Sequence, residues 1–179
     1  MNRGQLTIVA IFGVALLTAL FGQAYRFLQT REVLEFWGPD HAGRIASPDL
    51  VRLELLEPAD PVGVPEGEAA AIEIDGHWYR IVASRDVMQA PGMTNARHAL
   101  ARRDSYDWNR AVTGSTSWRY ALQFSSDTGE STVLLSADCM RIRPLDGERV
   151  VSVEPISTGL ATVFQQQLNR EMEAQDAGP

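Results

Sequence analysis

The stretch AAIEIDGHWYRIV, residues 70–82, carries the strongest structural signal in the chain. It consists of two short runs of strand-forming residues on either side of Asp75-Gly76. An Asp-Gly pair accepts the positive φ angles that a two-residue hairpin turn requires. The stretch therefore predicts a β-hairpin with strands at 70–74 and 77–82, and it places an antiparallel sheet in the domain.

Further strands are expected on both sides of this hairpin. Residues 50–56 alternate between two faces, which predicts a strand with one buried face. A second hairpin is predicted from a strand that begins at residue 118, a turn at 127–130 and a strand at 132–139. The first of these strands places four aromatic or aliphatic side chains on one face: Trp118, Tyr120, Leu122 and Phe124. Residues 149–153 are expected to add an edge strand.

Two helices complete the expected domain. Thr94 can cap a helix over residues 95–103, and Ser157 can cap a C-terminal helix. The C-terminal helix has an apolar stripe formed by Leu160, Val163, Phe164 and Leu168. We expect this stripe to pack against Trp118, Leu122 and Phe124. The order of elements predicts an α+β fold, in which a small antiparallel sheet of two hairpins and additional strands is covered on one face by helices.

The N-terminal segment is uncharged and strongly apolar from Leu6 to Phe21. These roughly sixteen residues span about 24 Å as a helix, and continuing the helix past Tyr25 and Phe27 brings it near the ~30 Å of a bilayer core. The sequence therefore predicts a single-pass transmembrane helix. The residues expected in the membrane are Leu6, Ile8, Val9, Ile11, Phe12, Val14, Leu16, Leu17, Leu20 and Phe21.

A cleavable signal peptide is the alternative reading of the same segment. Arg3 supplies a minimal basic start, and Gly22-Gln23-Ala24 has small residues where a signal peptidase cuts. Residues 25–36 contain no helix breaker, however, so the helix is expected to continue and the anchor is favoured. We expect a bacterial cell-membrane protein with an extracytoplasmic domain. Cleavage after Ala24 would instead release a secreted or periplasmic protein.

The domain organisation follows from these segments. The anchor helix and its extension occupy residues 1–37, and Gly38-Pro39-Asp40 is expected to end them and to begin a linker over residues 38–49. The α+β domain is expected at 50–174, with a disordered tail at 175–179. A single domain fits the chain of 179 residues, since cores commonly occupy about 100 to 150 residues.

Composition narrows the class of protein. The chain is 45% hydrophobic, which is enough for a packed core, and its net charge of −7 argues against nucleic-acid binding. All 16 basic residues are arginine, as expected of a bacterium with a GC-rich genome. The single cysteine, Cys139, excludes an intramolecular disulfide and is expected to be a small buried hydrophobe.

No constellation in the sequence identifies an enzyme. His41, His77 and His98 are scattered, without the spacing of a metal site, and neither a nucleophile elbow nor a phosphate-binding glycine loop is present. We therefore assign no catalytic residue, metal ligand or cofactor. A site assembled only by the fold could still use His77, His98, Asp138 or Cys139.

One basic cluster is a candidate site for an anion or a lipid headgroup. It comprises Arg97, Arg102, Arg103 and Arg110, which lie in an otherwise acidic domain. The alternative is a solvated helix face, because Asp104 and Asp107 are interleaved with these arginines. The four tryptophans could line a groove but are expected to belong to the core or its rim: Trp37, Trp78, Trp108 and Trp118.

Scattered short segments resemble a bacterial group of proteins. They are residues 34–38 (LEFWG), 49–53 (DLVRL), 99–100 (AL) and 106–108 (YDW). In these patches the chain is similar to uncharacterised membrane-anchored proteins of planctomycete bacteria. The resemblance implies a bacterial origin and an anchor, and it transfers no site because it contains no specific motif.

These observations favour a membrane-tethered extracytoplasmic accessory or interaction module without catalytic activity, such as a subunit of a membrane complex. Its expected partners are the membrane, through the N-terminal helix, and other proteins or further copies of itself. The alternative is a small envelope enzyme or ligand-binding domain whose site is not visible in the sequence.

Overall fold

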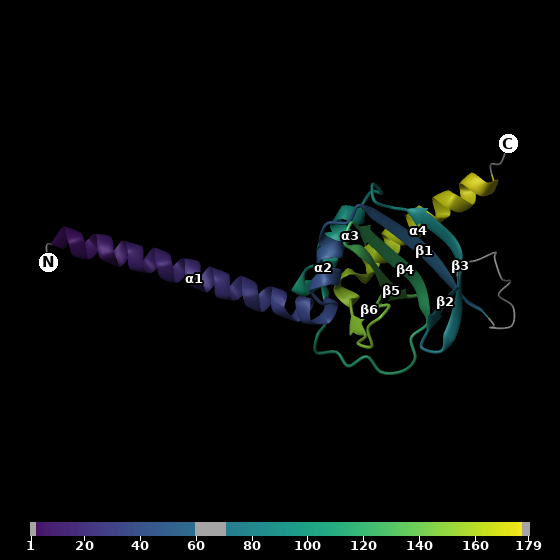
Figure 1. Cartoon of the computed structure of the whole chain (residues 1–179), viewed down its shortest axis with the longest axis horizontal. Helices are drawn as coiled ribbons and strands as arrows, with labels where there is room; N and C mark the ends of the chain where they lie inside the picture. The colour runs from purple at the N-terminus through teal and green to yellow at the C-terminus, as the bar shows by residue number, and fades with distance from the viewer. Residues whose placement is uncertain (1–2, 60–70, 177–179) are drawn as a thin grey trace.

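The structure is a computed structural model that describes residues 3–59 and 71–176, and it has an α+β fold. Its centre is an antiparallel seven-stranded sheet in the order β2-β3-β1-β4-β5-β6-β7. Helix α1 projects from one side of the domain as a long rod, and the C-terminus lies on the opposite side (Figure 1). The helices are α1 (Arg3–Trp37), α2 (Pro39–Ala46), α3 (Met93–Leu100), the 3₁₀ turn η2 (Arg103–Ser105) and α4 (Glu154–Asp176). The strands are β1 (Leu50–Ala59), β2 (Ala71–Ile74), β3 (His77–Asp86), β4 (Trp118–Ser126), β5 (Gly129–Ser136), β6 (Arg141–Pro144) and β7 (Val151–Ser152).

Both predicted hairpins are confirmed. In the β2–β3 hairpin, Ile74 pairs with His77, and the two turn residues Asp75 and Gly76 have φ angles of 54° and 76°. Two consecutive positive φ angles are what a type I′ turn requires. The β4–β5 hairpin closes where Ser126 pairs with Gly129. Ala70, expected to start the first hairpin, lies outside the described residues.

Two register shifts change which face some strand residues occupy. The β1–β3 ladder shifts between Leu55 and Leu56, and the β4–β5 ladder shifts between Trp118 and Tyr120. An extra residue in one strand moves every later side chain to the other face. The prediction that Trp118 shares a face with Leu122 and Phe124 is therefore wrong for Trp118, which belongs to a separate apolar cluster.

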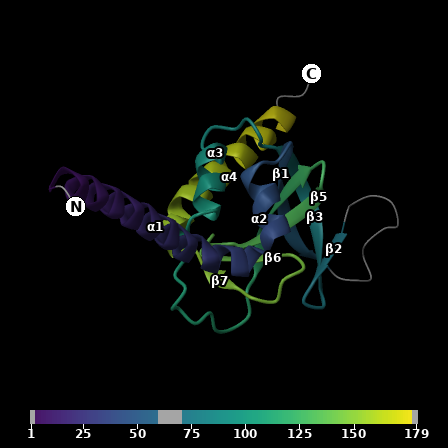
Figure 2. The ribbon, with the colours of Figure 1, turned by 60° about the vertical axis from the view of Figure 1, so that its left-hand side comes forward.

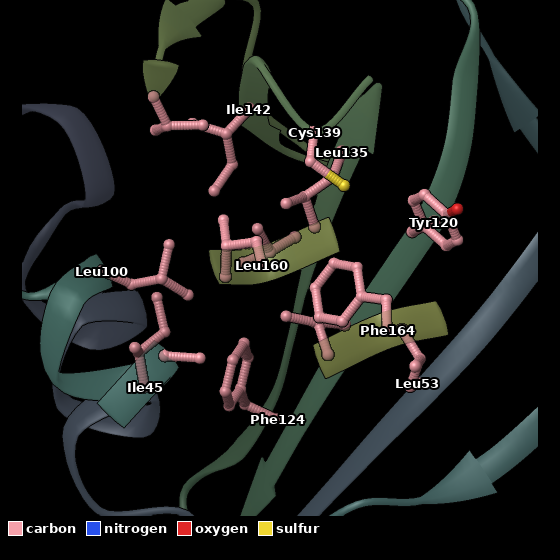
Figure 3. Packing of buried hydrophobic residues seen from close by; sticks show 14 of the residues in the cluster. Ile45, Leu53, Leu100, Tyr120, Phe124, Leu135, Cys139, Ile142, Leu160 and Phe164 are labelled. Carbon is pink, nitrogen blue, oxygen red and sulfur yellow. The ribbon is translucent and has the colours of Figure 1, made fainter. Parts of the chain in front are cut away.

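The main core lies between the helices and one face of the sheet. Helix α4 contributes Leu160, Phe164 and Leu168 to the same cluster as Leu122 and Phe124 of β4. Figure 3 shows Phe164 directed into this cluster beside Tyr120, with 5.3 Å between the two ring centroids. The predicted packing of the C-terminal helix on the sheet is thus confirmed, although the helix begins at Glu154 rather than at Ser157.

A second apolar cluster occupies the opposite face of the sheet. Its buried members are Leu56, Ile74, Tyr79, Trp118, Ala121 and Leu134. Arg143 of β6 closes over this cluster: its guanidinium lies 5.2 Å from the Trp118 ring centroid, and its Nη1 donates to Asp75 Oδ1 at 2.9 Å. Since four strands separate β6 from β2 in the sheet order, this contact requires the sheet to be strongly curled.

Residues 38–49, expected to be a linker, include helix α2. Pro39 occupies its first turn, where the missing N–H and the fixed φ of proline favour a helix start. Ile45 of α2 is 1% exposed, and Arg44 donates to the carbonyls of Thr128 at 3.0 Å and Glu130 at 3.1 Å. Burial of Ile45 therefore makes this segment part of the domain.

The other helix boundaries also differ from expectation. Helix α3 begins at Met93 after Gly92, which has a φ of 87°, and it ends at Leu100 instead of Arg103. Met93 and Leu100 are both fully buried, so packing sets these ends in place of the Thr94 cap. Gln175 and Asp176, expected in the tail, belong to α4, and residues 177–179 lie outside the described residues.

Candidate functional site

The C-terminal end of α1 is built into the domain. Val33, Phe36 and Trp37 are 4%, 7% and 3% exposed. The indole Nε1 of Trp37 donates to the hydroxyl oxygen of Tyr106 at 2.9 Å and to the carbonyl of Leu100 at 3.2 Å. Tyr106 donates to the same carbonyl, and burial raises the pKa of its phenol. The last turns of α1 are therefore held by core packing and buried hydrogen bonds.

Aromatic rings and an ion pair surround this junction. The Phe36 ring centroid lies 4.6 Å from that of Trp37 and 6.0 Å from that of Trp108, in edge-to-face arrangements. Glu32, one turn earlier on α1, accepts from Arg103 Nε at 2.6 Å. These contacts come from one face of α1, and they hold its last turns against the domain from which the rest of the helix projects (Figure 2).

The rest of α1 has the opposite character. The large apolar side chains described along it are 57% to 74% exposed, and they are Ile11, Phe12, Val14, Leu16, Leu17, Leu20 and Phe21. The structure does not describe the side chains of Leu6, Ile8 and Val9, which are expected in the membrane. Within residues 3–59 and 71–176, no helix combines the length and the apolar character needed to cross a membrane.

Of the four arginines predicted as a site, the structure brings Arg97 and Arg102 to the same hollow. Three of them are paired with carboxylates: Arg102 with Asp104, Arg103 with Glu32, and Arg110 with Glu154. Such exposed pairs neutralise the charge that was expected to attract an anion.

Arg97 differs from the other three arginines. It forms no ion pair with any described residue, and the contact found for its guanidinium is a weak one, 3.7 Å from Nη1 to the sulfur of Met88. Its Nε is buried and has no hydrogen-bond partner among the described residues. Arg97 lines a hollow of about 240 Å³ together with His98 and Arg102.

An apolar groove adjoins this hollow, at the junction of α1, α2 and α3. The groove has a volume of about 220 Å³, and its lining includes Val33, Leu34 and Trp37 of α1, Ile45 of α2, and Leu100 and Ala101 at the end of α3. Ile45 and Ala101 line the hollow as well, so the two spaces are neighbours. Sequence reasoning missed this groove because it treated the α2 segment as a linker, although Ile45 there was a detectable apolar signal.

The residues considered for an enzyme site are dispersed. His98 lies on the exposed surface of α3, whereas Asp138 lines a different hollow together with Arg110 and Arg141. His77 is the exposed first residue of β3. No group of three His, Cys, Asp or Glu side chains suited to a metal ion occurs within the described ranges 3–59 and 71–176.

Cys139 and Asp138 are neighbours with different environments. Cys139 is fully buried, as expected, and burial raises the pKa of its thiol to about 12. Burial also acts to raise the pKa of Asp138, but hydrogen bonds from the Ser136 hydroxyl and the Met140 N–H outweigh it and lower that pKa. A protonated thiol beside a stabilised carboxylate is a poor nucleophile, since the thiolate is the reactive form.

The tryptophans divide between core and rim. Trp37 and Trp118 are buried, Trp108 packs at the edge of the main core, and Trp78 is 36% exposed on β3. Trp37 lines the apolar groove, so one of the four belongs to a hollow as well as to the core. No protein-family model, curated protein or solved structure matches this chain significantly.

Proposed function

We propose that the chain is a membrane-anchored interaction module, with α1 as its anchor and the α+β domain as its extracytoplasmic part. One observation carries the proposal: a single 35-residue helix is buried in the domain at one end and, among its described side chains, exposes large apolar residues throughout the run from Ile11 to Phe21. Exposed apolar surface on this scale is costly in water and marks contact with a membrane or a partner. The uncharged run from Leu6 to Phe21 favours the membrane.

The rigid junction supports a role in positioning. A flexible linker would let the domain sample many orientations, whereas Trp37, Phe36 and the Glu32–Arg103 pair hold the domain at one angle to α1. A domain held in this way presents one preferred face to its neighbours. This favours a subunit or accessory protein, with other proteins or a second copy as partners, over a catalyst.

An alkaline carbonate wash of membranes tests the anchor directly. The full chain is expected to stay with the membranes, and the variant Leu16→Arg/Leu17→Arg is expected to be released, because two charges in the apolar run oppose insertion. Val82→Arg is the matched control, since Val82 is an exposed aliphatic residue, 38% exposed, on the sheet. Release of the unmodified chain, or an intact mass that begins at Tyr25, would refute the anchor.

Orientation and partners need separate measurements. Protease added to intact spheroplasts is expected to digest the proposed extracytoplasmic domain, and protection of the domain would place it on the cytoplasmic side. Chemical crosslinking before detergent extraction is expected to give a discrete larger species. Recovery of the monomer alone in several detergents would count against an interaction module.

A further inference from the structure

We propose that the apolar groove and the Arg97 hollow together bind one anionic, single-chain lipid. The acyl chain would lie in the groove, and its carboxylate would meet the Arg97 guanidinium. This inference deepens the proposed function and rests on it for the source of the ligand, which is the membrane that α1 enters.

The first support is the continuity of the two spaces. The groove of about 220 Å³ is bounded mainly by aliphatic and aromatic carbon, and the hollow of about 240 Å³ carries Arg97, His98 and Arg102. Ile45 and Ala101 line both, so the two spaces are neighbours, and a ligand that extends past these two residues occupies both. An apolar space that ends at a cation complements a molecule with an apolar chain and an anionic end.

The second support is the state of Arg97. A partly buried guanidinium normally has a carboxylate or several carbonyl partners, because removing its charge from water is costly without them. The Nη1 of Arg97 contacts the Met88 sulfur, and its buried Nε has no hydrogen-bond partner among the described residues. A ligand carboxylate in the hollow would pair with the terminal nitrogens of this guanidinium, which have no carboxylate partner among the described residues, through charge-assisted hydrogen bonds.

The size and position of the groove favour a single-chain lipid. A space of about 220 Å³ is small for two acyl chains side by side. Thr30, the groove residue nearest the apolar run on α1, lies three residues beyond Phe27, or about 4.5 Å along the helix, so the groove lies close to the proposed membrane surface. A lipid with one chain binds membranes only marginally and exchanges readily. The groove, with space for one chain, therefore fits a fatty-acid type of ligand.

Tryptophan quenching by a brominated fatty acid tests the proposal. The full chain is placed in nanodiscs of unbrominated phosphatidylcholine, and 9,10-dibromostearate is added at alkaline pH. Residues 1–36 contain no tryptophan, whereas Trp37 lines the groove, so quenching reports lipid at the domain and not lipid around the anchor. The Trp37→Phe variant is expected to lose the saturable quenching, which assigns the signal to this ring.

One ligand control and three further variants complete the test. The methyl ester of the same acid lacks the negative charge and is expected to quench the tryptophan of the unmodified chain at least tenfold less strongly than the acid does. The acid is expected to show the same loss of quenching with the Arg97→Gln variant. Ala101→Leu, at the exposed rim, narrows the groove and is expected to abolish binding. Arg52→Gln, on an exposed residue of the other sheet face, is expected to leave quenching unchanged.

Three quenching results would overturn the proposal. Equal quenching by acid and ester, or unchanged quenching in Arg97→Gln, would overturn the proposal. Equal quenching by brominated phosphatidylcholine in the disc would also overturn it, because bilayer lipid would then reach Trp37. Insertion into the discs is measured independently by their co-elution with the protein. Failure of the anchor is thereby distinguished from failure of the groove to bind.

Discussion

Phe164 of α4 provides the sharpest test of how the domain is held together. Its side chain is fully buried in the main core, 5.3 Å from Tyr120 between ring centroids. Truncating a buried phenylalanine to alanine costs about 3 to 5 kcal/mol, because transfer energy is lost and a cavity is left. A domain of this kind is stable by about 5 to 15 kcal/mol, so Phe164→Ala should remove a large share of that stability.

Urea denaturation of the full chain in detergent micelles measures the effect through tryptophan fluorescence. With a denaturant dependence of about 2 kcal/mol per molar urea, the midpoint is expected to fall by about 2 M. Gln166→Ala is the matched control, because Gln166 is exposed on the same helix two residues away. Equal midpoints for Phe164→Ala and Gln166→Ala would show that α4 does not dock on the sheet and that the assignment of the main core is mistaken.

Three further predictions concern other contacts. Gly92→Ala should lower the free energy of unfolding by about 2 to 4 kcal/mol in urea melts, because the φ of 87° strains alanine and the new Cβ would lie 2.7 Å from a methyl carbon of Val163. Adding Val163→Ala to this variant should recover part of that free energy, and the absence of any recovery would contradict the contact. Cys139 should resist maleimide labelling at pH 8 until urea unfolds the chain, and fast labelling of the folded protein would argue against its burial. The pKa of the thiol is about 8.5 in the unfolded chain and about 12 in the folded one, so the contribution of Cys139 to stability should fall as pH rises between these values. Arg143→Gln should lower the thermal midpoint by an amount equivalent to about 1 to 3 kcal/mol, and Asp75→Asn should lower it less because Asp75 is 56% exposed. A larger effect of Asp75→Asn would argue against the conclusion that Arg143 covers the second apolar cluster of the curled sheet.

Local sequence was sufficient for the hairpins and for the C-terminal helix. Asp75-Gly76 accepts positive φ angles with little help from its surroundings, and the turn forms as expected. The stripe of Leu160, Phe164 and Leu168 has helical spacing, and all three residues are buried in the main core. Both signals depend on neighbours within a few residues, which is why they can be interpreted without the fold.

The linker and the candidate site could not be predicted in the same way. Gly38-Pro39 predicts the start of a linker, yet Pro39 begins α2 because Ile45 is buried against the main core. The arginine cluster was defined by closeness in sequence, whereas the structure pairs Arg103 with Glu32, 71 residues away. The apolar groove was invisible because its walls come from three separate helices.

The sequence by itself determined the strand pairs next to each turn, the apolar face of α4, the apolar character of the segment from Leu6 to Phe21 and the burial of Cys139. The tertiary structure decided the order of strands in the sheet, the register shift that sends Trp118 to the second cluster, and which of the four predicted arginines lacks a carboxylate partner among the described residues. Periodicity and turn chemistry act over a few residues and are written in the sequence directly. Register, curl and ion pairing depend on which distant segments exclude water from each other, and only the folded chain brings those segments together.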